Sequence, residues 1–174
     1  MSNSQLILGG ARSGKSQRAL MSAEAMASRR LFIATAEAWD DEMADRIARH
    51  QDERGPGWTT VEAPLDLTST LLASTQTADV CVVDCLTLWL SNLMHHNRDV
   101  ETETAELCEV IPTLTIPVLF VSNEVGLGLV PETPLGRRFR DAQGRLNQAV
   151  AKVCDRVEFI AAGLPITLKG EGQP

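Results

Sequence analysis

Short apolar runs alternate with longer amphipathic segments along most of the chain, and this alternation predicts its secondary structure. The apolar runs are rich in valine, isoleucine and leucine, which is typical of buried β-strands. We expect strands at residues 5–9, 31–35, 59–62, 80–84, 118–122 and 156–160, and a short edge strand at 166–169. The segments between them predict helices at residues 15–28, 40–54, 65–73, 87–94, 102–110 and 137–154.

The order of these elements indicates an α/β fold. Strands that alternate with helices form a mostly parallel sheet with helices on both faces. A chain of 174 residues is long enough to bury one such core, and no linker or repeat divides it. We therefore expect a single nucleotide-binding α/β domain over residues 1–174. In sheets of this kind the ligand binds at the carboxyl ends of the strands.

The first expected strand leads directly into a phosphate-binding loop. The motif G-x-x-x-x-G-K-[ST] is matched at every position by Gly9, Gly10, Ala11, Arg12, Ser13, Gly14, Lys15 and Ser16. Glycines let several backbone N–H groups point at one spot, and the following helix adds the positive end of its dipole. We expect Lys15 to reach the β- and γ-phosphates and the Ser16 hydroxyl to ligate Mg²⁺. An ordinary glycine-rich turn is the alternative, but the strand before and the helix after favour the phosphate loop.

The fourth expected strand ends in an acidic residue, Asp84, after four apolar residues. This pattern resembles a Walker B strand, whose carboxylate holds Mg²⁺ opposite the loop hydroxyl, here that of Ser16. The alternative is an aspartate that caps the next helix. The presence of the phosphate loop favours the metal role.

Two other strand ends also carry candidate nucleotide contacts. The second strand leads into Ala34, Thr35 and Ala36, whose small side chains leave room for a ligand. Tight packing of a helix on the sheet explains them equally well. The third strand ends in Glu62, whose carboxylate is suited to accept the N1–H and amino group of guanine. From the residues alone, a solvated glutamate is the favoured interpretation.

The expected helix at residues 40–54 carries a candidate nucleophile, His50. Met43, Ile47 and His50 share one face, so the histidine lies along the inward stripe of the helix. Arg46 and Arg54 lie one turn to either side, and this arrangement suits an anionic phosphate chain. The alternative is a partly buried histidine bonded to the backbone, and the residues alone leave the two open.

Charge and composition limit the kinds of binding partner and the cellular location that we expect. The chain has 16 basic and 23 acidic residues, and its net charge of −7 argues against a nucleic-acid partner. No apolar run approaches the roughly 18 residues that span a membrane, and the amino terminus does not resemble a signal peptide, so we expect a cytoplasmic protein. The four cysteines form no C-x-x-C pair and are expected to be small core residues. His95 and His96 point in different directions on a helix and are expected to lie on the surface.

Two further segments each have two possible interpretations, and a third matches a motif that we discount. Residues 123–131 form a loop that either closes on a substrate or is purely structural. The arginines of residues 136–145 either meet phosphates or form a solvated face. Residues 141–144 match the D-x-x-G motif of GTPases, but they lie inside a helical pattern and no N-K-x-D motif accompanies them. We therefore discount a regulatory GTPase.

Taken together, these landmarks resemble one family, the bifunctional adenosylcobinamide kinase / adenosylcobinamide-phosphate guanylyltransferases of cobalamin biosynthesis. The resemblance runs in order along nearly the whole chain. The matching segments are residues 9–16, 33–36, 40–43, 46–50, 58, 61–62, 83–87, 122–131, 139–141 and 144–147.

The resemblance implies an enzyme with two reactions. ATP or GTP first phosphorylates adenosylcobinamide, and GTP then donates GMP to the product through a GMP–histidine intermediate, giving adenosylcobinamide-GDP and pyrophosphate. The histidine at the matching position is His50. The resemblance also implies a RecA-type three-layer P-loop fold, Mg²⁺ as cofactor and assembly as a homotrimer. It further implies nucleotide contacts from Gln51, Asp52, Glu53, Arg54 and Glu62.

Three alternatives remain from the sequence. One is a small-molecule kinase with a single activity, in which His50 is structural. Another is a non-catalytic GTP-binding module, although the chain lacks switch motifs at its expected strand ends. The third is a family member that has kept only the guanylyl transfer, because the same phosphate loop serves both reactions.

Overall fold

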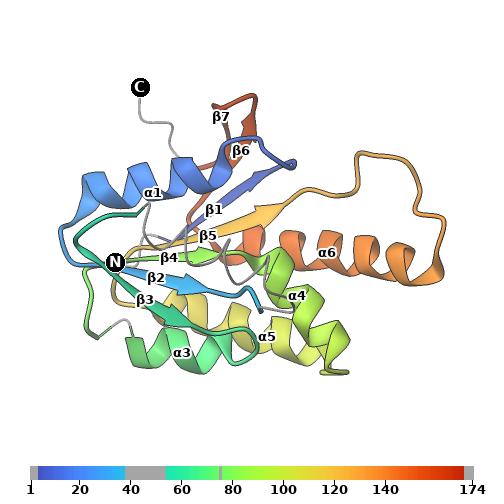
Figure 1. Ribbon diagram of the computed structural model, residues 1–174, viewed down its shortest axis with the longest axis horizontal. Helices are drawn as coiled ribbons and strands as arrows, with labels where there is room; N and C mark the ends of the chain where they lie inside the picture. Colours follow the sequence, from blue (N-terminus) through green and yellow to red (C-terminus); the bar gives the residue numbers. More distant parts are fainter. Residues whose placement is uncertain (1–3, 38–53, 75, 171–174) are drawn as a thin grey trace.

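The protein is built around one twisted seven-stranded sheet (Figure 1). Its structure is a computed structural model that describes residues 4–37, 54–74 and 76–170. In the sheet the strands follow the order β3-β2-β4-β5-β1-β6-β7. Their bounds are β1 Ser4–Gly9, β2 Arg30–Ala34, β3 Trp58–Glu62, β4 Val80–Asp84, β5 Val118–Asn123, β6 Arg156–Ala161 and β7 Leu164–Lys169. All neighbouring pairs are parallel except β6 and β7.

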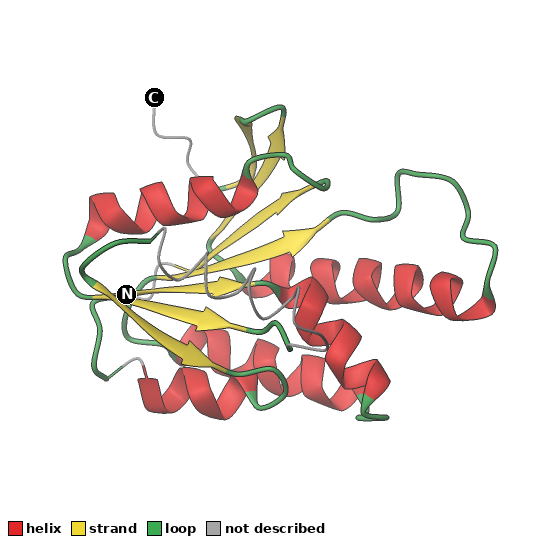
Figure 2. Cartoon of the chain, viewed as in Figure 1, coloured by secondary structure: helices red, strands yellow, loops and turns green. Residues whose placement is uncertain are grey.

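Helices cover the sheet on both faces (Figures 1 and 2). On one side lies α1. On the other lie α3, α4, α5 and α6. The bounds are α1 Lys15–Met26, α3 Leu67–Ser74, α4 Leu86–His95, α5 Val100–Val110 and α6 Pro134–Val153, and a short 3₁₀ helix, η1, spans Ile111–Thr113. This is the three-layer, mostly parallel α/β fold that the alternation of elements predicted.

Alternate residues of each central strand point to opposite faces and so fill two cores. Leu6 and Phe120 face the larger core, which lies under α3 to α6. Ile7 and Leu119 face the smaller one, where Ala19 of α1 packs on the sheet. The strands are therefore apolar on both faces, which explains their continuous hydrophobic runs.

The expected elements agree with the structure to within a few residues at their ends. The largest difference is at α6, which begins three residues earlier than predicted because Thr133 caps it and Pro134 occupies its first position. The Thr133 hydroxyl accepts a hydrogen bond of 3.0 Å from the Gly136 N–H. The expected helix at residues 40–54 lies almost wholly outside the described residues. Among the described helices, none has both the length and the apolar character needed to cross a bilayer.

Candidate nucleotide-binding site

Parallel pairing brings the carboxyl ends of the strands to one edge of the sheet. Gly9 at the end of β1 pairs with Asn123 of β5 and Ile160 of β6. Ala34 at the end of β2 pairs with both Asp84 of β4 and Glu62 of β3. The register thus gathers the candidate residues of four strand ends at the edge where α/β proteins bind their ligands.

The phosphate loop connects β1 to the first turn of α1. Arg12 and Gly14 have positive φ angles of 54° and 95°, so the backbone turns back on itself before the helix begins at Lys15. A side chain on Gly9 would collide with the Ser13 hydroxyl and come within 2.9 Å of the Ile160 carbonyl oxygen. The closure of the loop therefore needs glycine at position 9.

The charges of Lys15 and Asp84 both act on the Cys85 thiol. The Lys15 side chain is buried, and its Nζ donates a 3.0 Å hydrogen bond to the Gly10 carbonyl. Burial raises the pKa of the Cys85 thiol to about 11; the Asp84 carboxylate acts in the same direction and the Lys15 ammonium in the opposite one. Ser16 lies beside Lys15 in the first turn of α1 and is partly exposed. The structure thus brings a lysine, a hydroxyl and a carboxylate to the mouth of the loop.

Thr35 joins the end of β2 to the segment that follows Asp84. Its hydroxyl donates to the Cys85 carbonyl at 2.7 Å and accepts from the Cys85 N–H at 2.8 Å, and the residue is fully buried. Asn92 of α4 donates to the Thr35 carbonyl at 2.7 Å. The packing interpretation therefore accounts for the Thr35 hydroxyl, whereas nucleotide contact by Ala34, Thr35 and Ala36 stays a prediction.

Arg54 lies on the same face of the sheet as α1. Its guanidinium carbon is 3.7 Å from the centroid of the Phe32 ring, and Nη2 donates to the Thr60 hydroxyl at 3.0 Å. Burial lowers the pKa of Arg54, and the Asp84 carboxylate acts in the opposite direction. The arginine is therefore held within electrostatic reach of Asp84. Glu62 is exposed at the same edge of the sheet.

The candidate nucleophile and several expected nucleotide contacts belong to the segment before Arg54. His50, Gln51, Asp52 and Glu53 lie outside the described residues, as does Arg46.

A partly buried polar network, which no expected site residue anticipated, fixes the end of β5. Thr87 Oγ1 accepts a hydrogen bond of 2.8 Å from the Asn123 N–H, and Asn147 Nδ2 donates to the Asn123 carbonyl at 3.0 Å. Ser122 Oγ donates to Asn147 Oδ1 at 2.7 Å, and Gln143 Nε2 donates to Ser122 Oγ at 3.0 Å. Most of its members lie in segments that match the family, but no local pattern links them, because they come from three separate elements.

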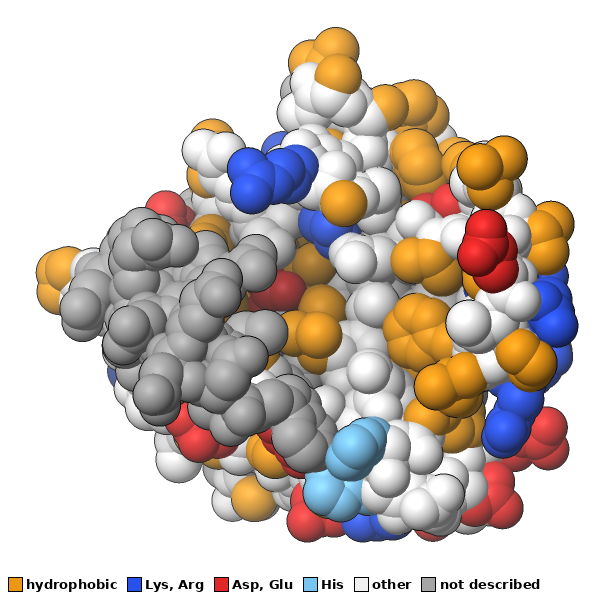
Figure 3. Space-filling view, turned by 45° about the vertical axis from the view of Figure 1, so that its right-hand side comes forward, with side chains coloured by type: hydrophobic (Ala, Val, Ile, Leu, Met, Phe, Trp, Pro, Cys, Tyr) orange, Lys and Arg blue, Asp and Glu red, His pale blue; other side chains and the backbone are white. Residues whose placement is uncertain are grey.

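The loop between β5 and α6 is held at both ends and exposes apolar side chains between them. The Glu124 carboxylate accepts hydrogen bonds from the N–H groups of Gly126 and Leu127 at 2.7 and 3.1 Å. At the other end Arg137 donates to the carbonyls of Pro131 and Glu132. Leu129 is 96% exposed. Figure 3 turns this side of the molecule forward and shows hydrophobic side chains gathered on it.

The basic and D-x-x-G segments both belong to α6. Residues 141–144 lie inside this helix and not at a strand end, as their helical pattern predicted. Arg140 pairs with its neighbour Asp141 at 3.0 Å. A role of these arginines toward phosphates stays a prediction.

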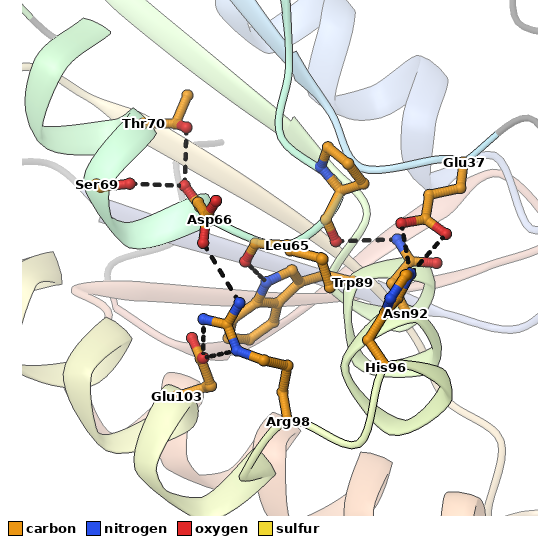
Figure 4. A network of polar contacts seen from close by, with 11 residues as sticks. Glu37, Leu65, Asp66, Ser69, Thr70, Trp89, Asn92, His96, Arg98 and Glu103 are labelled. Atoms are coloured by element: carbon orange, nitrogen blue, oxygen red, sulfur yellow. Dashed lines mark hydrogen bonds and ion pairs between the residues drawn. The ribbon is translucent and has the colours of Figure 1, made fainter.

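A second polar network anchors α4 beside the site (Figure 4). His96 Nε2 lies 3.1 Å from the Glu37 carboxylate, and Trp89 Nε1 donates to the Leu65 carbonyl at 2.8 Å. His95 is the last residue of α4 and His96 follows it, and their rings meet edge to face with centroids 5.5 Å apart. Both residues are exposed, as expected.

Comparison with known proteins identifies the family. A family model described as cobinamide kinase / cobinamide phosphate guanyltransferase (CobU) matches residues 5–168. The bifunctional adenosylcobalamin biosynthesis protein CobP of Pseudomonas aeruginosa is 46% identical over 168 residues, which cover 95% of this chain and 97% of the relative. The CobU proteins of Salmonella typhimurium and Escherichia coli are 35% and 34% identical over 182 aligned residues, covering 94% of this chain and 98% of each relative.

A solved structure supports the fold independently. The KaiC-like protein of Pyrococcus horikoshii superimposes with a TM-score of 0.52 at 12% identity, over 90% of this chain and 70% of that one. At this identity the likeness concerns the fold alone, here the RecA-type arrangement of three layers. With the family match over nearly its whole length, the chain belongs to the cobinamide kinase / cobinamide phosphate guanyltransferase family.

Proposed function

We propose that this chain catalyses both reactions for which its family is named. It phosphorylates adenosylcobinamide with ATP or GTP, and it then transfers GMP from GTP to adenosylcobinamide phosphate, releasing pyrophosphate and forming adenosylcobinamide-GDP. The single observation that carries the proposal is a complete phosphate loop at the carboxyl edge of the sheet, with Lys15 buried beside the Gly10 carbonyl.

The phosphate loop holds the triphosphate in both reactions. Backbone N–H groups at the start of α1 face the phosphates, and the Lys15 ammonium neutralises the charge that develops on them. Ser16 and Asp84 supply the hard oxygen ligands that Mg²⁺ prefers, one from each side of the site. When bound there, the ion would neutralise further phosphate charge.

The guanylyl transfer needs a nucleophile, and we assign this role to His50. A neutral imidazole nitrogen attacks the α-phosphorus of GTP; an N–P bond forms, the bond to the bridging oxygen breaks, and pyrophosphate leaves. A phosphate oxygen of adenosylcobinamide phosphate then attacks the same phosphorus and releases the imidazole. His50 precedes Arg54 by only four residues, a chain length that reaches at most about 14 Å. Since Arg54 lies within electrostatic reach of Asp84, this tether supports the assignment.

Several finer roles belong to the same proposal. Glu62 accepts hydrogen bonds from the guanine edge, and Gln51, Asp52, Glu53 and Arg54 contact the nucleotide together with residues 34–36. The chain acts as one domain over residues 1–174, as a homotrimer in the cytoplasm and without a nucleic-acid partner. The family resemblance and the net charge of −7 support these statements.

The test follows the α-phosphate of GTP. Wild type, His50→Ala and the control His95→Ala are incubated with Mg²⁺ and GTP labelled at the α-phosphate and then denatured. We expect label on wild type and on His95→Ala that is labile in acid and stable in base, and none on His50→Ala. His50→Ala should retain kinase activity.

Three results would contradict the proposal in different ways. Wild type that binds GTP but retains no label points to a kinase with a single activity or to a GTP-binding module. Label that persists on His50→Ala overturns the choice of nucleophile. Loss of kinase activity alone in His50→Ala overturns the division of roles.

A further inference from the structure

The turn between β6 and β7 contacts the phosphate loop. Its central residues, Ala162 and Gly163, both have positive φ angles, 51° and 80°, as in the tight type I′ turn of a hairpin. The Gly163 N–H donates a hydrogen bond of 2.8 Å to the Ser13 carbonyl. Gly163 Cα also lies 3.4 Å from the position that a Cβ on Gly14 would occupy. A hairpin about 150 residues away in the sequence therefore packs against the middle of the loop.

This hydrogen bond orients one particular peptide group. In a trans peptide the carbonyl and the following N–H point in opposite directions. The Ser13 carbonyl faces the hairpin, so the Gly14 N–H points away from the hairpin. That N–H belongs to the set of amides that a phosphate loop directs at its anion.

The sequence around this peptide group gives it freedom to rotate. Gly14 has a φ of 95°, and glycine adopts either sign of φ at little cost. A rotation of the Ser13–Gly14 peptide would turn the carbonyl oxygen toward the phosphates and the N–H away from them. The bond from Gly163 opposes this rotation, because it is lost when the carbonyl turns.

We propose that the β6–β7 turn is a positioning element of the nucleotide site, in which the Gly163 N–H holds the Ser13–Gly14 peptide in the orientation that binds phosphate. The inference rests on the proposed function only in taking a nucleoside triphosphate as the ligand of the loop. Gly163 touches no substrate and acts through the loop alone. Without its N–H, a fraction of molecules carries the rotated peptide, and the apparent affinity for phosphates falls in proportion.

The test removes a single hydrogen-bond donor. Cys154 follows α6 directly, so residues 1–153 can be joined as a thioester to a synthetic peptide of residues 154–174 at this native cysteine. Glycolic acid in place of Gly163 replaces the N–H by an oxygen and changes no side chain. We expect the dissociation constant of Mg-GTP to rise about 3- to 10-fold, the size that follows from losing one hydrogen bond. The affinity for inorganic tripolyphosphate, measured by competition, should fall by the same factor, because tripolyphosphate binds the loop through its phosphates and has no nucleotide base.

Two controls distinguish the effect of losing the Gly163 N–H donor from the effect of changing the conformation of the turn. The all-amide protein made by the same ligation gives the reference affinity. Gly163→Ala keeps the N–H but places a side chain at positive φ, so it should lower the melting temperature and leave the affinity near the reference. An ester protein that binds as tightly as the all-amide protein overturns the inference, as does an equal loss of affinity in Gly163→Ala. If the all-amide protein fails to bind Mg-GTP, the proposed function is wrong and the inference falls with it.

A measurement on wild type covers the case in which the ester protein does not fold. If Gly163 stabilises the binding orientation, then a bound triphosphate must stabilise the Gly163 hydrogen bond by the same factor. In protein labelled at its 12 glycines with ¹⁵N, hydrogen exchange of the Gly163 amide should slow about 3- to 10-fold with Mg-GTP and should not change with guanosine. Exchange of this amide that Mg-GTP leaves unchanged overturns the inference.

Discussion

Lys15 and Arg18 lie one turn apart on α1, yet the structure uses the two cations differently. Arg18 donates two hydrogen bonds of 3.0 Å to the Glu158 carboxylate on β6, and Arg156 donates to the same carboxylate. Glu158 is fully buried. Hydrogen bonding to Glu158 raises the pKa of Arg18. Arg18 thus pairs with a buried carboxylate that would be unstable without a positive partner.

Lys15 is nearly as buried as Glu158, but its hydrogen bond goes to the uncharged Gly10 carbonyl. Across the described ranges of the chain, no carboxylate comes within ion-pair distance of Lys15 Nζ. A buried ammonium held only by a carbonyl is costly unless an anion reaches it. A cation paired within the protein thus holds α1 on the sheet, whereas a cation without a carboxylate partner remains available for phosphate.

The strongest test of this difference is Lys15→Ala. We expect both activities to fall about 100-fold or more, because removing one charged group that stabilises the transition state costs this much. The melting temperature should change little, since Lys15 makes no salt bridge among the described residues. Lys152→Ala, which removes an exposed lysine, serves as the control. A large loss of stability in Lys15→Ala would mean that Lys15 also holds the fold together, as Arg18 does.

The matching test on the paired cation is Glu158→Gln. It leaves two arginines facing a neutral side chain, and we expect the free energy of unfolding to fall by about 2 kcal/mol, below the value for a fully buried pair because Arg18 is partly exposed. Denaturant unfolding measures the loss. Activity per folded molecule should stay at the wild-type level. An inactive but stable Glu158→Gln protein would show that the ion pair serves the chemistry.

The same pair predicts a pH dependence. Burial raises the pKa of Glu158, but hydrogen bonds from Arg18 and Arg156 outweigh it and hold the pKa below its ordinary value of 4.5. The ion pair therefore contributes its full stability above that value and loses it as the pH falls through the lower folded pKa. The stability gap between wild type and Glu158→Gln should be largest near pH 7 and narrow progressively below about pH 4.5. A gap that is constant from pH 7 to pH 3 would contradict this account.

The smallest expected effect concerns the turn that contacts the phosphate loop. Ala162 has a positive φ, where asparagine is accommodated better than alanine, and Asn-Gly is the preferred pair for a type I′ turn. Ala162→Asn should raise the free energy of unfolding by about 0.5 kcal/mol without weakening Mg-GTP binding. Thermal unfolding and nucleotide titration measure the two effects. A loss of stability would mean that asparagine does not relieve the strain at this position.

Local sequence patterns predicted most of the secondary structure because each pattern is read within one segment. The glycines and lysine of the phosphate loop, and Asp84 after four apolar residues, depend only on their neighbours in the chain. Element ends were less predictable: α6 starts at Pro134 because Thr133 caps it, a signal that the helical period does not contain. For Thr35 the sequence left both ligand contact and packing open. In the structure its hydroxyl makes two buried hydrogen bonds with the Cys85 backbone, which is the packing role.

The strand–loop–helix unit of the phosphate site, the α/β fold and the resemblance to the family could be inferred from the sequence, because they depend on short motifs and on hydrophobic periodicity. The contacts between groups on different strands and helices became visible only in the folded structure. Arg18 and Glu158 are 140 residues apart in the sequence, and Ser13 and Gly163 are 150 residues apart. No local pattern links the two members of either pair. Their meeting depends on β6 pairing with β1, and strand order in a sheet is a property of the whole packed core.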